Sequence, residues 1–375
     1  MKLLPRLKIA QKLPLALVGS ALVVSAGVGI ASYMIGLGTV QEQREQSMQA
    51  SLNTAAALVT DYYSNAEVDL RLFVQRSDTV TAFKNLSRAL DELRMGLGDG
   101  ANAQLVTAYV TESPNPEDRA AVDSNIKGAM YDAPHKRFHP GFRTLVNERN
   151  YSDVLLISPA GDVFCSVAKN TDFASNVASD ASGLGRAFAA AATLAEGQAA
   201  FVDFTNYGPT GTAQSFMAMP IYERDENIGV MVLSISSDAV SSRVSGLSGL
   251  GRSGEVVVVG QDGLLRTESP RTEESDVLVT PLTSEVITNA FAGISGEGMS
   301  TDYRNAPMVV RAQPVTIGDV TWAVAAVQPE QEAFAAVVQM RNMTLAIGGG
   351  LLAIAAVLGV LFARTISRPI TRLTD

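Results

Sequence analysis

The sequence of 375 residues predicts an α+β protein in which two transmembrane helices and a long stalk helix flank two tandem antiparallel-sheet units. Three observations predict this fold class. Two uncharged apolar runs bracket the chain, helical periodicity follows the first run, and strand-turn-strand patterns occur twice, about 100 residues apart. The content of 18% charged and 47% hydrophobic residues is typical of a folded protein with additional apolar sequence.

The two apolar runs are residues 13–36 and 342–363. At 1.5 Å per residue, a helix of either length crosses a hydrocarbon core of roughly 30 Å. The first run is longer than the apolar region of an ordinary signal peptide, although a cleaved signal is the alternative interpretation. Basic residues precede the first run within residues 1–12 and follow the second within residues 364–375, which predicts that both ends are cytoplasmic.

The charge of the intervening segment indicates an exported, solvated domain. Seven of the 29 Lys and Arg residues flank the apolar runs, so 22 remain in residues 37–341 beside 37 of the 38 Asp and Glu residues, a net charge of −15. Such a segment does not present a nucleic-acid surface. With one cysteine, Cys165, and two histidines, the sequence predicts neither a disulfide framework nor a zinc cluster, and we expect Cys165 to be a buried strand residue.

A stalk helical region is predicted over residues 37–95. Apolar residues recur at spacings of three and four from Met48 to Phe73, with no proline or glycine. The stripe that they form can pack on the same domain or on a second copy of the chain. Both interpretations stay open, and the second predicts a homodimer.

Two sheet units follow, a membrane-distal unit over 96–240 and a membrane-proximal unit over 241–330. Residues 153–167 and 254–269 each show an apolar run, a turn and a second run.

Residues 214–236 and 306–329 show a second strand-turn-strand pattern in each unit, and helical segments lie between the hairpins. Each unit is therefore predicted to be an antiparallel sheet with helices on one face and a ligand pocket between them.

Several stretches carry a family resemblance. They are "YDAPHKRFHPGFR" at 131–143, "YSDVLLISPAGDVFCSVAKNTDFASN" at 151–176, "FVDFTNY" at 201–207 and "GLGRSGEVVVVGQDGLLRTES" at 249–269. With these stretches the chain resembles the double Cache sensors, tandem PAS-like units, of bacterial transmembrane receptors, chiefly methyl-accepting chemotaxis proteins. "ISRPITRLTD" at 366–375 is similar to the start of a HAMP linker. The chain departs from the family at Asn170, where an acidic residue is usual, so the resemblance implies no particular ligand.

The resemblance implies a two-pass chemoreceptor of the bacterial inner membrane that is not itself an enzyme. Its periplasmic sensor would bind a small molecule, without a cofactor or metal, and the homodimer would signal through the second transmembrane helix to cytoplasmic partners. Arg364, Arg368 and Pro369 would transmit the signal, and the signalling domain is absent from the sequence. A sensor of an adenylate or diguanylate cyclase or of a histidine kinase is the alternative. An anchored periplasmic enzyme is disfavoured because the sequence contains no G-x-S-x-G, H-E-x-x-H or P-loop motif.

Candidate ligand-binding residues lie at the ends of apolar segments of the first sheet, where polar groups orient a ligand among apolar walls. They are Phe164, Lys169, Asp172, Asp203, Tyr207 and Phe216. The alternative is that they are ordinary turn and edge residues. In the second unit, Arg266 and Arg304 are further candidates.

His135 and His139 have the spacing of two metal ligands on one helix face. A structural role, with both imidazoles hydrogen-bonded beneath the first sheet, is favoured because two ligands rarely make a metal site.

Overall fold

The computed structural model describes residues 9–98, 100–125, 130–247 and 250–362. The chain forms two compact units. The terminal unit comprises Met1–Gln49 and Pro329–Asp375, and the central unit comprises Ala50–Gln328. Arg364, Arg368 and Pro369, predicted to transmit a signal, lie outside the described residues.

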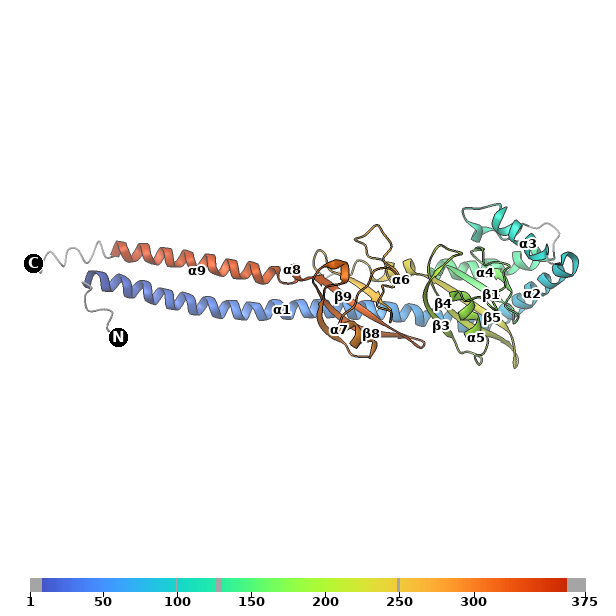
Figure 1. Cartoon of the computed structure of the whole chain (residues 1–375), viewed down its shortest axis with the longest axis horizontal. Helices are drawn as coiled ribbons and strands as arrows, with labels where there is room; N and C mark the ends of the chain where they lie inside the picture. The colour runs from blue at the N-terminus through green and yellow to red at the C-terminus, as the bar shows by residue number, and fades with distance from the viewer. Residues whose placement is uncertain (1–8, 99, 126–129, 248–249, 363–375) are drawn as a thin grey trace, which may run out of the picture. The chain divides into compact units, whose positions relative to one another are not determined.

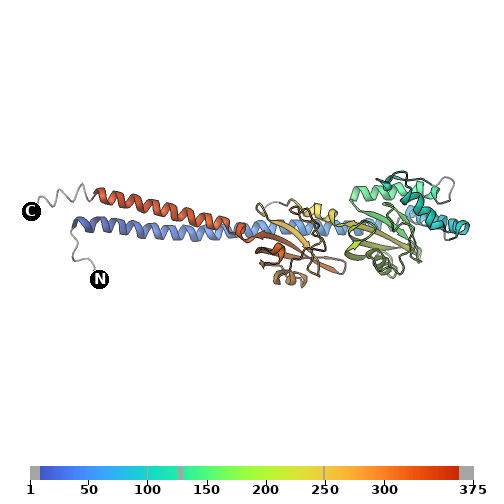
Figure 2. The ribbon, with the colours of Figure 1, turned by 45° about the horizontal axis from the view of Figure 1, so that its top comes forward.

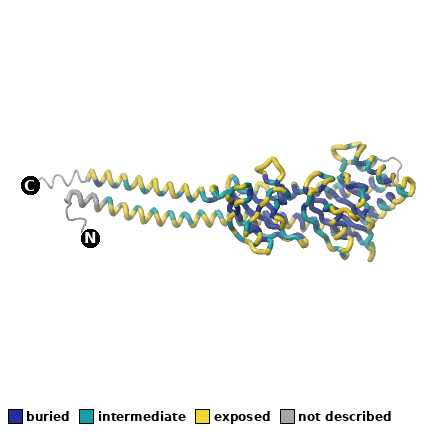
Figure 3. Tube along the Cα trace, viewed as in Figure 1, coloured by how far each residue is buried: buried dark blue, intermediate teal, exposed yellow. Residues whose placement is uncertain are grey.

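The terminal unit is helical. It contains the first part of α1 (Ile9–Val74), α8 (Glu330–Ala333) and α9 (Ala335–Phe362). Both α1 and α9 carry stretches that are long and apolar enough to cross a membrane. Apolar residues of these stretches are exposed, for example Ile35 and Leu345, and Figure 3 draws most of α9 as exposed. Exposed apolar residues over such a length are typical of helices that lie in lipid. The two apolar helices that the sequence predicted are therefore present.

The second part of α1 belongs to the central unit, and its apolar stripe packs within the chain. Leu52, Val59 and Leu70 are fully buried. The Tyr63 hydroxyl lies 2.9 Å from Ser215 Oγ on the first sheet. Helix α1 ends at Val74, and α2 (Ser77–Leu97) follows after a two-residue turn. Packing on the same domain therefore accounts for much of the stripe, and pairing with a second copy stays a prediction.

The first sheet has five strands in the order β2-β1-β5-β4-β3. The strands are β1 (Asp153–Ile157), β2 (Val163–Ser166), β3 (Ala200–Tyr207), β4 (Thr212–Glu223) and β5 (Glu226–Ser236). The pairs β1/β2 and β4/β5 are antiparallel, which confirms two of the predicted hairpins.

Helices cover both faces of this sheet, whereas the sequence predicted helices on one face. On one side lies α5 (Gly183–Ala191), which begins where the Ser182 hydroxyl accepts a hydrogen bond from the Gly185 amide. On the other side lie α2 and α4 (Asp132–Arg149) (Figures 1 and 2). The strand sequences explain why both faces are covered. Successive residues of a strand point to opposite faces, and neighbours such as Leu155 and Leu156 are both apolar and fully buried.

Shorter elements join these layers. They are α3 (Gly100–Val106), a π-helical turn (Thr107–Thr111), a 3-10 turn (Arg119–Ala121) and α6 (Ser237–Val244).

The second sheet has four strands in the order β6-β9-β8-β7, and α7 (Glu285–Phe291) packs on β7 and β8. Its strands are β6 (Glu255–Val259), β7 (Gly296–Ser300), β8 (Met308–Ile317) and β9 (Val320–Pro329), with a 3-10 turn at Tyr303–Asn305.

The second arm of the predicted hairpin 254–269 forms no strand in the described part of the chain. Leu265 makes an isolated bridge to Val259 and exchanges backbone hydrogen bonds with Leu278 and Thr280. The segment therefore pairs with β6, as the hairpin prediction requires, through this bridge and through the Arg266 amide, which donates to the Val258 carbonyl oxygen at 2.7 Å. Its additional pairing with the later loop at Leu278 and Thr280 is a contact that a local pattern does not encode.

Candidate functional site

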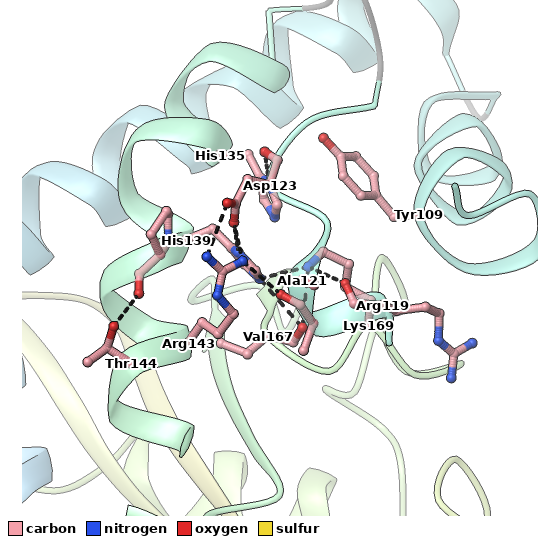
Figure 4. Close-up of polar contacts among 12 residues, drawn as sticks. Tyr109, Arg119, Ala121, Asp123, His135, His139, Arg143, Thr144, Val167 and Lys169 are labelled. Carbon is pink, nitrogen blue, oxygen red and sulfur yellow. Dashed lines mark hydrogen bonds and ion pairs between the residues drawn. The ribbon is translucent and has the colours of Figure 1, made fainter. Parts of the chain in front are cut away.

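Two buried polar clusters lie on opposite faces of the first sheet, near β1 and β2. The acidic cluster, on the α5 side, consists of Asp153, Ser166, Asp172 and Tyr207. The histidine cluster, on the α4 side, consists of Asp123, His135, His139, Arg143 and Lys169 (Figure 4).

Strand alternation positions Asp153 in the acidic cluster. It is the first residue of β1, and it shares a face with Leu155 and Ile157, which belong to the core beneath α5. Its carboxylate accepts hydrogen bonds from Ser166 Oγ at 2.6 Å and from the amides that follow β2, including Val167 N at 2.8 Å. The side chain is thus held in one orientation from several sides.

Asp172 is less completely satisfied. The Tyr207 hydroxyl donates to its Oδ2, but its Oδ1 is buried and has no hydrogen-bond partner among the described residues. The residue is only 7% exposed. The ring of Phe216 lies 5.0 Å from that of Tyr207 and forms an apolar wall beside the pair. Three of the six predicted ligand-binding residues, Asp172, Tyr207 and Phe216, are therefore together.

The close packing at this point requires glycine at the start of α5. A Cβ added to Gly183 would lie 2.5 Å from Phe216 Cε2 and 2.6 Å from Thr205 Oγ1. The Thr205 hydroxyl oxygen is a second buried polar atom without a hydrogen-bond partner among the described residues. Two buried polar atoms without a described hydrogen-bond partner therefore lie on the α5 side of the sheet. They are Thr205 Oγ1 on β3 and Asp172 Oδ1 in the loop after β2.

The electrostatics of the acidic cluster favour protonation. Burial raises the pKa of Asp153 to about 7, and the negative charge of Asp172 adds to the shift. Burial also raises the pKa of Asp172, although the Tyr207 hydroxyl stabilises the carboxylate and opposes the shift. Among the described residues, no Lys, Arg or His nitrogen lies within 4 Å of either carboxylate. Neither carboxylate therefore forms an ion pair among the described residues, and the charge of Arg119 only opposes the rise in the pKa of Asp172.

The histidine cluster is built by α4. His135 and His139 are one turn apart, their rings stack at 4.5 Å, and the helix continues through Pro140. His139 Nδ1 lies 2.8 Å from Asp123 Oδ1, and its Nε2 lies 2.7 Å from Lys169 Nζ (Figure 4). His135 Nδ1 lies 2.8 Å from the Asp123 carbonyl oxygen. Both imidazoles are thus hydrogen-bonded within the protein.

Lys169 is a buried cation that the chain satisfies fully. It also donates to the carbonyl oxygens of Arg119 at 3.1 Å and of Val167 at 3.3 Å, besides the bond to His139. Burial lowers the pKa of Lys169 to about 8. Burial, and then the charge of Lys169, lower the pKa of His139 to about 4. At neutral pH, a neutral imidazole therefore accepts a hydrogen bond from a lysine ammonium.

Within the described ranges, no three His, Cys, Asp or Glu residues are grouped so that they could hold a metal ion. Arg143 donates to both oxygens of the Asp123 carboxylate, at 2.7 and 3.2 Å, so that acid already has a cationic partner.

The other three predicted ligand-binding residues lie elsewhere. Phe164 packs edge-on against Phe83 of α2, at 4.7 Å between ring centroids, on the α4 side. Lys169 belongs to the histidine cluster. Asp203 forms an ion pair with Arg266, with a shortest distance of 2.9 Å, at the contact between the two sheets.

The sequence analysis did not identify Asp153 as a candidate. Its sign in the sequence is a single acidic residue at the start of a strand whose other residues are all apolar and buried.

The sequence profile of the Cache domain family matches residues 38–337. The probable chemoreceptor y4sI of Sinorhizobium fredii is 24% identical over 282 residues, which are 71% of this chain and 35% of that protein. The chain thus spans about a third of the length of this curated relative.

Two solved structures are similar to this chain over about three quarters of its length. The ligand-binding domain of the Pseudomonas aeruginosa amino acid chemoreceptor PctB, in complex with L-Arg, is 14% identical, with a TM-score of 0.44 over 78% of this chain and 98% of that chain. An extracellular ligand binding receptor from Desulfohalobium retbaense is 14% identical, with a TM-score of 0.41 over 75% of this chain and 40% of that chain.

Proposed function

Because this chain belongs to the Cache domain family, we propose that it is the sensory part of a transmembrane chemoreceptor that binds a small molecule at the acidic cluster. The observation that carries this proposal is the carboxylate of Asp172. Its Oδ1 is buried without a hydrogen-bond partner among the described residues. An unsatisfied buried polar group destabilises a protein by about 1 to 3 kcal/mol, and a ligand that donates a hydrogen bond there removes that cost.

The proposed organisation follows the sequence. Residues 1–12 would be cytoplasmic, residues 13–36 and 342–363 would cross the inner membrane, and the central unit would be periplasmic. Residues 364–375 would start a HAMP linker. Two chains would pair along the stalk, and the ligand would shift the second transmembrane helix relative to the membrane.

Modest affinity is sufficient for such a receptor. A ligand with micromolar affinity has about 8 kcal/mol of binding free energy, while coupling between sites typically uses about 1 to 3 kcal/mol. Helix shifts of about 1 to 2 Å are typical of such transitions.

A second candidate is the sensor of a membrane cyclase or histidine kinase. The same membrane-anchored sensor can be joined to any of these cytoplasmic domains. Joining the chain after Asp375 to the HAMP and cytoplasmic part of a characterised chemoreceptor would test transmission. Ligand-dependent activity of the receptor-coupled kinase supports the proposal, and activity that never responds to a bound ligand contradicts it.

The binding site is tested by thermal unfolding of the full chain in lipid nanodiscs, with amino acids, organic acids and polyamines. A ligand raises the melting temperature in proportion to its occupancy. We expect Asp172→Asn to reduce that rise, because the amide has the same shape without the charge. Asp225→Asn, at an exposed turn position, is the matched control. A ligand that stabilises both variants equally does not bind at the acidic cluster.

A further inference from the structure

Two grooves run along the pair of apolar helices in the terminal unit, where α1 and α9 lie side by side (Figures 1 and 2). The first groove has a volume of about 510 Å³ and the second a volume of about 320 Å³. Four residues line both grooves, and they therefore mark the line along which the helices meet. They are Ser25, Gly29, Thr344 and Gly348.

The two helices are antiparallel. A Cβ added to Gly29 would lie 3.5 Å from Thr344 Cγ2, and a Cβ added to Gly36 would meet the side chain of Met340. Later residues of α1 therefore lie beside earlier residues of α9, so the end of the first apolar run and the start of the second are at the same level.

The grooves differ in charge. Arg341 and Tyr33 line the first groove, and Arg341 is the one charged residue among its described lining residues. The second groove is lined by aliphatic residues, glycine, serine and threonine, and none of its described lining residues is charged. Within the part of the chain that the structure describes, the first groove alone thus offers a cation to a bound molecule.

Arg341 is available to a partner at the edge of the membrane. It is exposed, and it directly precedes the uncharged run 342–363. Its guanidinium makes two long hydrogen bonds, of 3.3 and 3.4 Å, to Oδ1 of the neighbouring Asn342, and it forms no ion pair with a described acid. An anion can replace these weak bonds without breaking an ion pair. Arginine and tyrosine are both suited to the boundary of the hydrocarbon core, because each combines an apolar body with a polar tip.

The length of the first groove matches one leaflet of a bilayer. Leu352, at its other end, is eleven positions after Arg341. That separation is about 16 Å along a helix at 1.5 Å per residue, about half of a hydrocarbon core of roughly 30 Å. Between the two ends the walls are apolar or small, as at Leu22 and Leu345. The groove therefore combines a cation at the membrane boundary with an apolar path through one leaflet.

We propose that the first groove binds one phospholipid of the periplasmic leaflet, with the phosphate at Arg341 and an acyl chain between α1 and α9. A guanidinium donates strong charge-assisted hydrogen bonds to phosphate oxygens. This inference rests on the proposed function, because it requires that both helices cross the membrane.

A transmembrane helix of a second copy fits the first groove less well. The runs 13–36 and 342–363 contain no acidic residue, so such a helix has no anion to offer Arg341 within the hydrocarbon core. The second groove, which has no described cation, remains available for pairing of two chains.

The test measures lipid binding by the full chain. The purified chain in detergent micelles is mixed with a phosphatidylglycerol, or with the diacylglycerol that has the same two acyl chains and no phosphate. Native mass spectrometry counts the lipids bound to each chain over a series of lipid concentrations. We expect the phosphatidylglycerol to bind about tenfold more tightly or better, the size expected for hydrogen bonds to a charged group.

Two pairs of variants locate the lipid. Arg341→Gln should weaken phosphatidylglycerol binding about tenfold, and Arg341→Lys should weaken it less because the charge is kept. Gly349 lines the first groove, whereas Gly350 lines neither groove, and a Cβ at either position meets no atom within 4 Å. Gly349→Leu should therefore reduce lipid binding several-fold by filling the groove, and Gly350→Leu should leave it unchanged.

Three results would overturn the inference. They are equal binding of the diacylglycerol and the phosphatidylglycerol, wild-type lipid binding by Arg341→Gln, and equal lipid binding by the two leucine variants. If Gly349→Leu separates a dimer and leaves lipid binding unchanged, the groove belongs to a second copy of the chain instead.

The outcome is separable from that of the proposed function. If alkaline carbonate washes the full chain out of membranes, the chain does not span them, and the proposed organisation and this inference fail together. If the chain stays in the membrane and its ligand response depends on Asp172, but its lipid binding does not depend on Arg341, this inference alone fails.

Discussion

The ion pair between Asp203 and Arg266 should stabilise the contact between the two sheets, and Asp203→Asn tests it. Arg266 donates to both oxygens of Asp203, at distances from 2.9 to 3.2 Å, and its side chain is 4% exposed. Trp322 of β9 donates its indole N–H to Asp203 at 3.0 Å. The variant keeps the shape of the side chain and removes the charge that compensates a buried guanidinium.

The expected loss can be worked out from these contacts. Removing one partner of a buried ion pair costs about 3 to 5 kcal/mol. Asp203 is 24% exposed, and Arg266 keeps a second acid, Asp262, at 2.9 Å. We therefore expect a loss of about 2 to 3 kcal/mol. At about 2 to 4 °C per kcal/mol for domains of roughly this size, the melting temperature should fall by about 4 to 12 °C.

Trp322 makes the measurement direct, because it is the one tryptophan of the sequence and it is fully buried at this contact. Urea unfolding of the full chain, followed by tryptophan fluorescence, gives the midpoint and the slope for each variant. Asp319→Asn, at an exposed turn position beside β9, is the control. If Asp203→Asn and Asp319→Asn unfold within about 0.5 kcal/mol of each other, the limit for ordinary surface changes, the reasoning from burial is wrong.

Three further predictions concern the buried charges. Lys169→Met should destabilise the protein by about 2 to 4 kcal/mol in urea unfolding, because His139 Nε2 and two carbonyl oxygens lose their donor; a loss below about 1 kcal/mol would contradict this. The pKa of His139 is about 4 when folded and about 6.5 when unfolded, so the unfolded chain binds more protons between these values. The wild type should therefore gain stability relative to His139→Gln as the pH rises from 4 to 6.5, by up to about 1.4 kcal/mol per pH unit, and equal pH profiles would exclude this role. Arg304→Ala should lower the melting temperature because Glu255 and Asp276 lose their cation, and n-propylguanidinium should restore part of it; equal restoration by n-propylurea would refute the electrostatic explanation.

Local patterns in the sequence predicted much of the fold, because they report contacts between near neighbours. The apolar runs predicted α9 and the start of α1. Strand-turn-strand patterns predicted the hairpins β1/β2 and β4/β5, since a hairpin pairs residues that are close in the chain. The pairing of Leu265 with Leu278 and Thr280 was not predictable in this way.

The candidate ligand-binding residues were only partly predictable. In the loop after β2, the backbone conformation determines on which face of the sheet each side chain lies. Lys169 and Asp172 are three residues apart, and the sequence placed both in one site. Lys169 adopts a left-handed conformation with φ 51°, and the two side chains join different clusters on opposite faces. The partner of Asp203, Arg266, is 63 positions away in the chain.

The sequence alone thus determined that two apolar helices flank two sheet units, because hydrophobic periodicity is a local property. Only the tertiary structure decided which acids share a cluster. The surroundings of Asp172 Oδ1, which has no hydrogen-bond partner in the described part of the chain, depend on contacts between distant segments. The same is true of the cation that Arg304 supplies to the acids of the second sheet. Such contacts are selected by burial and charge when the chain packs, and no single stretch of sequence contains both partners.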